Sequence, residues 1–182
     1  VTKAIKPLGM PHAIFQIDID SDKNKVYSAR GIDQINYLIS ANKGQPQQPL
    51  NKVASGGELS RISLAIQVEA ARYAKIPTLV FDEVDVGIGG GIAEVVGKLI
   101  RTLGESRQVI CITHLPQVAS QGHQHLKVIK TSGKTSTKTD ISPLDNNQRI
   151  AEIARMLGGV KITEQTLAHA EEMLAKSSEA NK

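Results

Sequence analysis

Three short stretches of the chain hold residues whose types and spacing suit them to bind or transfer a charged group. They are Ala54 to Arg61 (ASGGELSR), Thr78 to Asp85 (TLVFDEVD) and Val109 to Pro116 (VICITHLP). Each stretch joins polar residues to one end of an apolar run, where a helix or a strand would present them. These polar residues are the candidates for function.

The first stretch predicts the start of a helix. Ser55 and Glu58 have the spacing of a capping box, and apolar residues follow at helical intervals. A cap stabilises a helix by about 1 kcal/mol, whereas each glycine in a helix destabilises it by up to about 1 kcal/mol relative to alanine. Gly56 and Gly57 therefore need a further reason, and one is that backbone N–H groups without a Cβ beside them can approach an anion directly. On this motif alone, a plain helix cap and an anion site remain equally open. The expected apolar stripe is Leu59, Ile62, Ile66, Ala70 and Tyr73.

The second stretch predicts a strand that ends in two carboxylates. Residues 78–81 are rich in β-formers and follow Pro77, so we expect a buried central strand with Asp82 and Glu83 at its carboxyl end. Ligands of open parallel sheets bind at that end. The alternative for Asp82 and Glu83 is an exposed acidic turn.

The third stretch brings a histidine to the same place. After the glycine-rich segment 87–91, the apolar residues of 92–103 predict a helix that Gly104 ends, and residues 109–112 predict a second strand. Strand, helix and strand in this order form a right-handed parallel crossover. We therefore expect His114 at the same sheet edge as Asp82 and Glu83, although a lone histidine is more often structural.

The remaining elements predict an α/β fold with an antiparallel hairpin. Alternation favours strands over residues 12–20 and around 35–39, and a hairpin over 126–131 and 135–141. Two helices are predicted by apolar stripes near the C-terminus, and both stripes are interpreted as packing surfaces. Their residues are Ile150, Ile153, Met156 and Leu157 in the first and Leu167, Ala170, Met173 and Leu174 in the second.

Composition limits the classes of function. A chain of 182 residues with 40% hydrophobic content can form one domain or one lobe of a larger one. Five aromatic residues and no Trp argue against a base-stacking platform for single-stranded nucleic acid. The net charge of +4 comes from scattered residues, so we interpret it as a solvated face with a weak tilt toward polyanions. The single Cys111 and the lack of a long apolar segment favour a reducing cytoplasm and no membrane span.

Together the three stretches resemble the C-terminal half of an ABC-type ATPase head. In that resemblance they are the signature motif, the Walker B strand and the switch histidine. The segments ASGGELSR, DEVDVGIGG (82–90) and THLPQVA (113–119) are similar to those of SMC-like bacterial DNA repair ATPases. The likeness covers nearly the whole chain, including residues 8–12 and 157–159. Residues 1–182 would then be the C-terminal lobe of a P-loop ATPase head with a parallel sheet core flanked by helices, and residues 1–10 the remnant of a coiled-coil helix.

The resemblance implies roles for particular residues. Ser55, Gly56 and Gly57 would contact the γ-phosphate of an ATP held by a second head in a homodimer, and Glu58 would complete this cofactor-binding motif. Asp82 would hold Mg²⁺, Glu83 would polarise the attacking water and His114 would contact the γ-phosphate. It also implies DNA as a partner, as double-stranded ends, and a location at the nucleoid.

Two departures from the family pattern matter. SMC-type heads place an Asp seven residues after the first Walker B acid, where this chain has Gly89. No Gly-x4-Gly-Lys-Ser/Thr loop occurs, so the chain would depend on an N-terminal half of the same protein for Walker A and be inactive alone. A non-catalytic DNA- or protein-binding module, or a head lobe of another SMC-like ATPase, remains the alternative.

Overall fold

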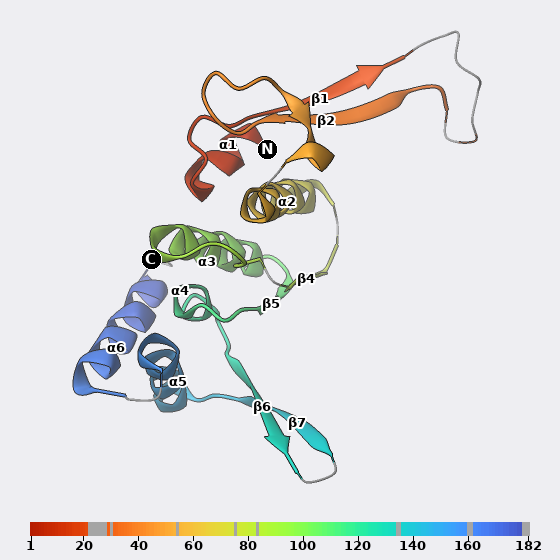
Figure 1. The fold of residues 1–182 in the computed structure, drawn as a ribbon. Coiled ribbons are helices and arrows are strands. Elements are labelled where there is room, and N and C mark those ends of the chain that lie inside the picture. Colours follow the sequence, from red (N-terminus) through yellow and green to blue (C-terminus); the bar gives the residue numbers. More distant parts are fainter. Residues whose placement is uncertain are drawn as a thin grey trace. The chain divides into compact units, whose positions relative to one another are not determined.

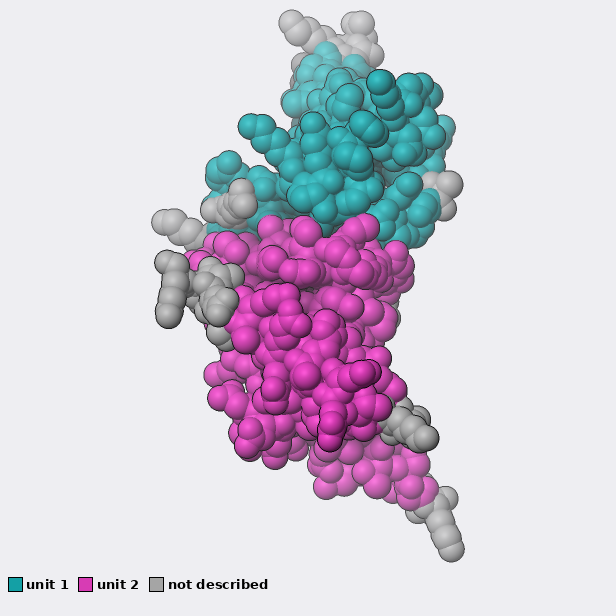
Figure 2. Space-filling view, turned by 90° about the vertical axis from the view of Figure 1, so that its left-hand side faces the viewer, with its two compact units in different colours: residues 1–76 teal, residues 77–182 magenta. Residues whose placement is uncertain are grey.

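The computed structural model describes residues 1–21, 29, 31–53, 55–74, 76–82, 84–133, 136–159 and 162–179. These residues form two compact units, Val1–Ile76 and Pro77–Lys182, which are coloured separately in Figure 2. Glu83, one of the predicted site residues, lies outside the described residues, as do residues 134–135 of the predicted hairpin. Each unit has its own elements and core.

The first unit joins a short antiparallel sheet to one long helix (Figure 1). The sheet has the order β1-β2-β3. Its strands and the neighbouring helices are α1 (Thr2–Ile5), η1 (Lys6–Leu8), β1 (Ile14–Asp20), β2 (Gln34–Ser40), β3 (Gln48–Pro49), η2 (Leu50–Lys52) and α2 (Gly56–Tyr73). The two strands predicted in the N-terminal third are therefore confirmed, with β1 beginning two residues later than expected.

The predicted faces of β1 and β2 are also confirmed. Phe15 pairs with Ile39, and Ile17 pairs with Tyr37, so the apolar residues of the two strands share one face. The rings of Phe15 and Tyr37 stack with their centroids 5.8 Å apart. Toward the far end of the hairpin this face is open, since Ile19 is 59% exposed.

The stripe predicted for α2 is partly wrong. Ile62 is buried as expected, but Tyr73 is 87% exposed. The buried face of α2 advances by three residues at a time through Ile62, Ala65 and Val68, because this is the side on which the helix contacts α1 and the core of the unit. The other core residues of the unit are Ile5, Leu8, Met10, Ala13, Ile39, Leu64 and Ala71.

The second unit begins with the predicted strand, helix and strand. β4 (Thr78–Asp82) and β5 (Gln108–Ile112) pair in parallel, and α3 (Gly90–Gly104) connects them. A short helix, α4 (Pro116–Ala119), follows β5 and packs against α3, and it was not predicted from the sequence. The predicted hairpin is confirmed as β6 (Leu126–Ser132) and β7 (Thr137–Pro143).

The expectation that β4 is a buried central strand is wrong for this chain. Phe81 is buried, but Val80 is 61% exposed, and Ile110 on the paired strand is 46% exposed. The parallel sheet has only these two strands among the described residues, and the face that carries Val80 and Ile110 is largely exposed. The expected parallel sheet core is thus two small sheets, one parallel and one antiparallel, with helices around them.

Two helices complete the second unit, α5 (Asn146–Gly158) and α6 (Glu164–Glu179). Their cluster centres on Ile153, Ala154 and Ala170, and all of the predicted stripe residues belong to it. The packing role predicted for both stripes is confirmed. Among the described helices, none combines the length and the apolar composition needed to cross a membrane.

Candidate functional site

The first group of predicted site residues lies at the start of α2. Ser55 is the N-cap in an extended conformation, and its Oγ accepts a hydrogen bond from the Glu58 N–H at 3.4 Å. One half of the predicted capping box is therefore present. A Cβ added to Gly56 would meet no atom within 4 Å. Packing among the described residues therefore gives no reason for glycine at this position.

The second group lies at the carboxyl edge of the parallel pair. Asp82 is the last residue of β4 and pairs with Ile112, the last residue of β5. His114 follows two residues later, so the prediction that Asp82 and His114 lie at one sheet edge is confirmed for the backbone. Both side chains are accessible, and that of His114 is 71% exposed. Ser55 to Glu58 belong to the first unit and Asp82 and His114 to the second.

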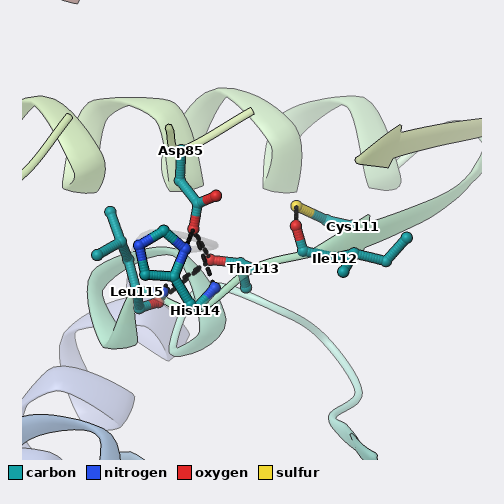
Figure 3. A network of polar contacts seen from close by, with 6 residues as sticks. All are labelled: Asp85, Cys111, Ile112, Thr113, His114 and Leu115. Atoms are coloured by element: carbon teal, nitrogen blue, oxygen red, sulfur yellow. Dashed lines mark hydrogen bonds and ion pairs between the residues drawn. The ribbon is translucent and has the colours of Figure 1, made fainter. Parts of the chain in front are cut away.

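A buried carboxylate, which the sequence did not single out, holds the His114 loop (Figure 3). Asp85 is only 1% exposed. Its Oδ2 accepts hydrogen bonds from the backbone N–H groups of His114 at 3.0 Å and Leu115 at 3.3 Å, and from the Thr113 hydroxyl. The same oxygen lies 3.3 Å from Nδ1 of His114.

The network ties the turn after β4 to the turn after β5. A buried carboxylate with several donors is stabilised by hydrogen bonds to its charged form, whereas each donor left unpaired would destabilise the fold by about 1–3 kcal/mol. Leu115 N–H also lies 3.0 Å from the Thr113 oxygen, so the loop is held twice. Asp85 is therefore a positioning residue that sets where the His114 ring can go.

Burial and, to a smaller extent, nearby carboxylates keep the neighbouring thiol protonated. Cys111 lies on β5, and burial, followed by the charges of Asp85 and Asp82, raises its pKa to about 11. A thiol with that pKa is protonated at neutral pH and is a poor nucleophile. Cys111 is therefore not a candidate nucleophile of this site.

The glycine-rich segment between β4 and α3 has two kinds of glycine. Gly87 and Gly90 have φ angles of 71° and 52°, a region that favours glycine. Gly89 instead has an extended φ of −165° and is the N-cap of α3 without a side-chain cap, and a Cβ there would meet nothing within 4 Å. An Asp would thus fit at position 89, so the local backbone does not require the departure from the SMC pattern.

Comparison with solved structures places the fold among SMC ATPase heads. The chain superposes on the Smc head domain of Pyrococcus yayanosii with a TM-score of 0.64 at 16% identity, covering 84% of this chain and 27% of that one. A structure from work on ATP-driven dimerization and DNA-stimulated activation of SMC ATPases gives a TM-score of 0.61 at 14% identity over 88% of this chain and 90% of that one. The architecture is that of the head domain of SMC ATPases.

Sequence comparison identifies the closer relationship. The chain is 54% identical over 174 residues to DNA repair protein RecN of Vibrio cholerae, and 42% identical over 150 residues to that of Bacillus subtilis. These matches cover 96% and 82% of this chain. The chain is a homologue of DNA repair protein RecN. It spans 31% and 26% of the length of these two relatives, and no family model matches it.

Proposed function

We propose that the chain is the C-terminal lobe of the ATPase head of a RecN-type DNA repair protein. The observation that carries the proposal is the buried Asp85, which holds the His114 loop at the sheet edge where Asp82 ends its strand. An open α/β sheet binds ligands at that edge. The homology to RecN and the SMC head fold support nucleotide hydrolysis as the chemistry of this edge.

The proposed site residues have different roles in phosphoryl transfer. Glu83, next to Asp82 in the sequence, polarises the attacking water, and His114 contacts the γ-phosphate. Ser55, Gly56 and Gly57 present the open N-terminus of α2 to the γ-phosphate held by a second head, and Glu58 completes that motif. Such a reaction needs positioned groups and neutralised charge more than covalent chemistry by the protein.

Asp82 fits a magnesium ion. Mg²⁺ keeps several waters and needs only one or two protein carboxylates beside the phosphates of a substrate. Asp82 is an exposed carboxylate at a strand end, and the described residues contain no group of three or more His, Cys, Asp or Glu that could hold a metal by themselves. When bound there, the ion would neutralise phosphate charge, while Asp82 holds and orients it.

The exposed apolar faces support a lobe that another lobe completes. Val80, Ile110 and Ile112 on the parallel pair are each 46–61% exposed, and Ile17 and Ile35 on the first sheet are 53% and 56% exposed. Contiguous apolar faces of this kind mark surfaces that pack against other protein. The N-terminal half of the same protein, which would bring Walker A, is the proposed partner. DNA, as double-stranded ends, and a cytoplasmic, nucleoid-associated location complete the proposal.

The test is Glu83→Gln in the full-length protein. The change keeps the shape of the side chain and removes its charge, so ATP still binds while turnover falls by about 10²-fold or more. Steady-state phosphate release gives the turnover, and equilibrium binding of a fluorescent ATP analogue gives the affinity. ATP-dependent association of heads persists longer than in the wild type.

Glu94→Gln is the matched control. Glu94 is an exposed carboxylate of α3 whose partner is Lys98 at 2.7 Å, so its loss leaves turnover unchanged. If Glu83→Gln keeps turnover within about threefold of the wild type, the water-polarising role is wrong. A full-length wild-type protein that neither binds nor hydrolyses ATP would favour the non-catalytic binding module instead.

A further inference from the structure

A cavity of about 360 Å³ lies among α3, α5 and α6 of the second unit. Its lining includes Arg101, Gly122, His123, Asn146, Arg149 and Glu171. None of these residues belongs to the proposed nucleotide site. The lining is polar and apolar in nearly equal parts, and its polar part includes two guanidinium groups.

Both arginines are held in place by the chain that follows α4. Arg101 Nη1 donates to the carbonyl oxygen of Gln121 at 2.6 Å. Arg149 Nη2 donates to the carbonyl oxygen of Gly122 at 2.6 Å, and its Nη1 donates to that of His123 at 3.3 Å. Among the described residues these bonds use three of the ten N–H donors of the two groups, so each guanidinium is oriented and has further donors without a described partner.

The two positive charges are not neutralised by the described part of the chain. Arg155, also on α5, pairs with Glu152 at 2.6 Å, whereas neither Arg101 nor Arg149 has an ion-pair partner among the described residues. The Nε atoms of both are buried without a hydrogen-bond acceptor. Burial and then the charge of Arg101 lower the pKa of Arg149. A bound anion would offset this repulsion between the two guanidinium groups.

Two further groups set the polarity of the cavity. Asn146 is the first residue of α5, so the positive end of that helix dipole is directed to the same region, although the Asp145 carboxylate caps the Gln148 N–H there. Glu171 on α6 is exposed, has no hydrogen bond or ion pair among the described residues, and places one negative charge on the opposite lining. The cavity is thus a cationic site with a single opposing carboxylate.

We propose that the cavity lined by Arg101, Arg149 and His123 binds a phosphate group. Two oriented guanidinium groups offer the paired donors that phosphate oxygens accept. The volume accommodates a phosphate with part of the molecule that carries it. The group belongs either to the backbone of DNA or to a small phosphorylated molecule, and both sources use the same contacts.

Calorimetric titration of the full-length protein with inorganic phosphate, at constant ionic strength, tests the site. Arg101→Gln weakens binding by about tenfold, because a hydrogen bond to a charged group is lost. Glu171→Gln removes the opposing charge and tightens binding by about threefold. Lys98→Gln makes the same change of charge as Arg101→Gln on an exposed part of α3 and leaves binding unchanged.

The direction of the Glu171→Gln effect separates a phosphate site from a purely structural role. Arginines that only hold residues 121–123 predict that any phosphate binding, including binding at the proposed nucleotide site, responds neither to Arg101→Gln nor to Glu171→Gln. We expect a dissociation constant of about 1 mM, so a phosphate concentration of about 50 mM should nearly saturate the site. Absence of binding at that concentration would overturn the proposal. So would equal affinities in the wild type, Arg101→Gln and Glu171→Gln. If Arg101→Gln fails to fold, the Glu171→Gln arm decides alone.

A second titration distinguishes the two sources of phosphate. With a DNA duplex of 20 base pairs, loss of one phosphate contact lowers the slope of log K against log salt by about 0.9. A lower slope in Arg101→Gln than in Lys98→Gln identifies the DNA backbone as the source. An unchanged slope, with weaker binding of inorganic phosphate, identifies a small phosphorylated molecule.

Discussion

Asp85 is the residue on which the geometry of the sheet edge depends most. One buried oxygen accepts bonds from three donors on the turn after β5, and these donors belong to consecutive residues. Nothing else among the described contacts links the two turns as closely. The exposed His114 ring is therefore positioned by its backbone, which Asp85 holds, and by the approach of its Nδ1 to the same Asp85 oxygen at 3.3 Å.

Replacing Asp85 by Ala leaves these donors without an acceptor. Amide exchange of His114 and Leu115 becomes faster by about tenfold to a hundredfold, since opening no longer breaks a hydrogen bond worth about 1.5–3 kcal/mol. Hydrogen exchange with mass spectrometry on the full-length protein measures this. Asp140→Ala removes an exposed carboxylate that pairs with Lys138 at 3.1 Å, and it leaves the exchange of residues 113–115 unchanged. Equal exchange in both variants would contradict the positioning role.

At the scale of elements, ion pairs of Glu152 join the hairpin to α5. Glu152 is 6% exposed, and its carboxylate lies 2.6 Å from Arg155 and 2.5 Å from Lys127 on β6. The hydrogen bond from Arg155 is the largest influence and, with that from Lys127, holds the pKa of Glu152 down to about 2 against the effect of burial. Folding is therefore linked to the ionised form of this carboxyl.

The sign of this linkage gives a pH prediction. Because the pKa is lower in the folded than in the unfolded state, the stabilisation is complete above about pH 5 and is lost as the pH falls toward 2; it amounts to about 3 kcal/mol. Urea unfolding of the wild type and Glu152→Gln at pH 7 and pH 2.5 measures it. The variant is less stable at pH 7, and the difference shrinks at pH 2.5. A difference that is the same at both values would show that Glu152 does not carry the linkage.

The contact of α3 with α4 depends on Gly97. A Cβ at this position would lie 2.7 Å from Gln121 Cγ and 3.0 Å from the backbone oxygen of Gln117. Alanine would favour the helix by about 1 kcal/mol, but the clash with the backbone of α4 outweighs this. A net destabilisation of about 1–3 kcal/mol is expected for Gly97→Ala.

Gly91→Ala is the control in the same helix. A Cβ there would meet nothing within 4 Å, so this change is neutral or stabilises the protein by up to about 1 kcal/mol. Urea midpoints of the two variants and the wild type give the comparison. If Gly97→Ala is as stable as Gly91→Ala, α4 does not pack as closely on α3 as the structure has it.

At the scale of the whole molecule, the proposed site is shared between two heads. Each site would combine Asp82, Glu83 and His114 of one protomer with Ser55 of the other. In full-length Ser55→Arg, the bulky side chain blocks the start of α2. In full-length Glu83→Gln, the carboxylate charge that polarises the attacking water is lost. Each homodimer is therefore expected to be inactive. In a mixed dimer one site carries both lesions and the other carries none.

Random equimolar mixing makes half of the dimers mixed, so about a quarter of wild-type turnover returns if the sites act independently. Phosphate release by the mixture measures this, and a labelled-subunit exchange assay establishes that mixed dimers form. Coupling between the sites would lower the recovered fraction. Mixed dimers that form and bind ATP but stay as inactive as their parents would rule out independent sites shared in trans.

The sequence by itself determined the local elements and the ends at which they present polar residues. The period of apolar residues and the glycine and proline signals are local, so they predicted the hairpins, the crossover and the helix that Ser55 caps. The parallel pairing that brings Asp82 and His114 to one edge followed from the order of those elements.

Only the tertiary structure decided what depends on contacts between distant residues. The sequence around Asp85 is that of an ordinary acidic turn. Its burial against residues 113–115 depends on the pairing of β4 with β5. The exposure of Val80 and Ile110 was misjudged because an apolar run looks the same whether one face or both faces of the strand are covered. The proximity of Arg101 to Arg149 had no local signal either. It arises because α3 and α5 both contact the chain after α4, and the periodicity of the sequence does not encode such a contact.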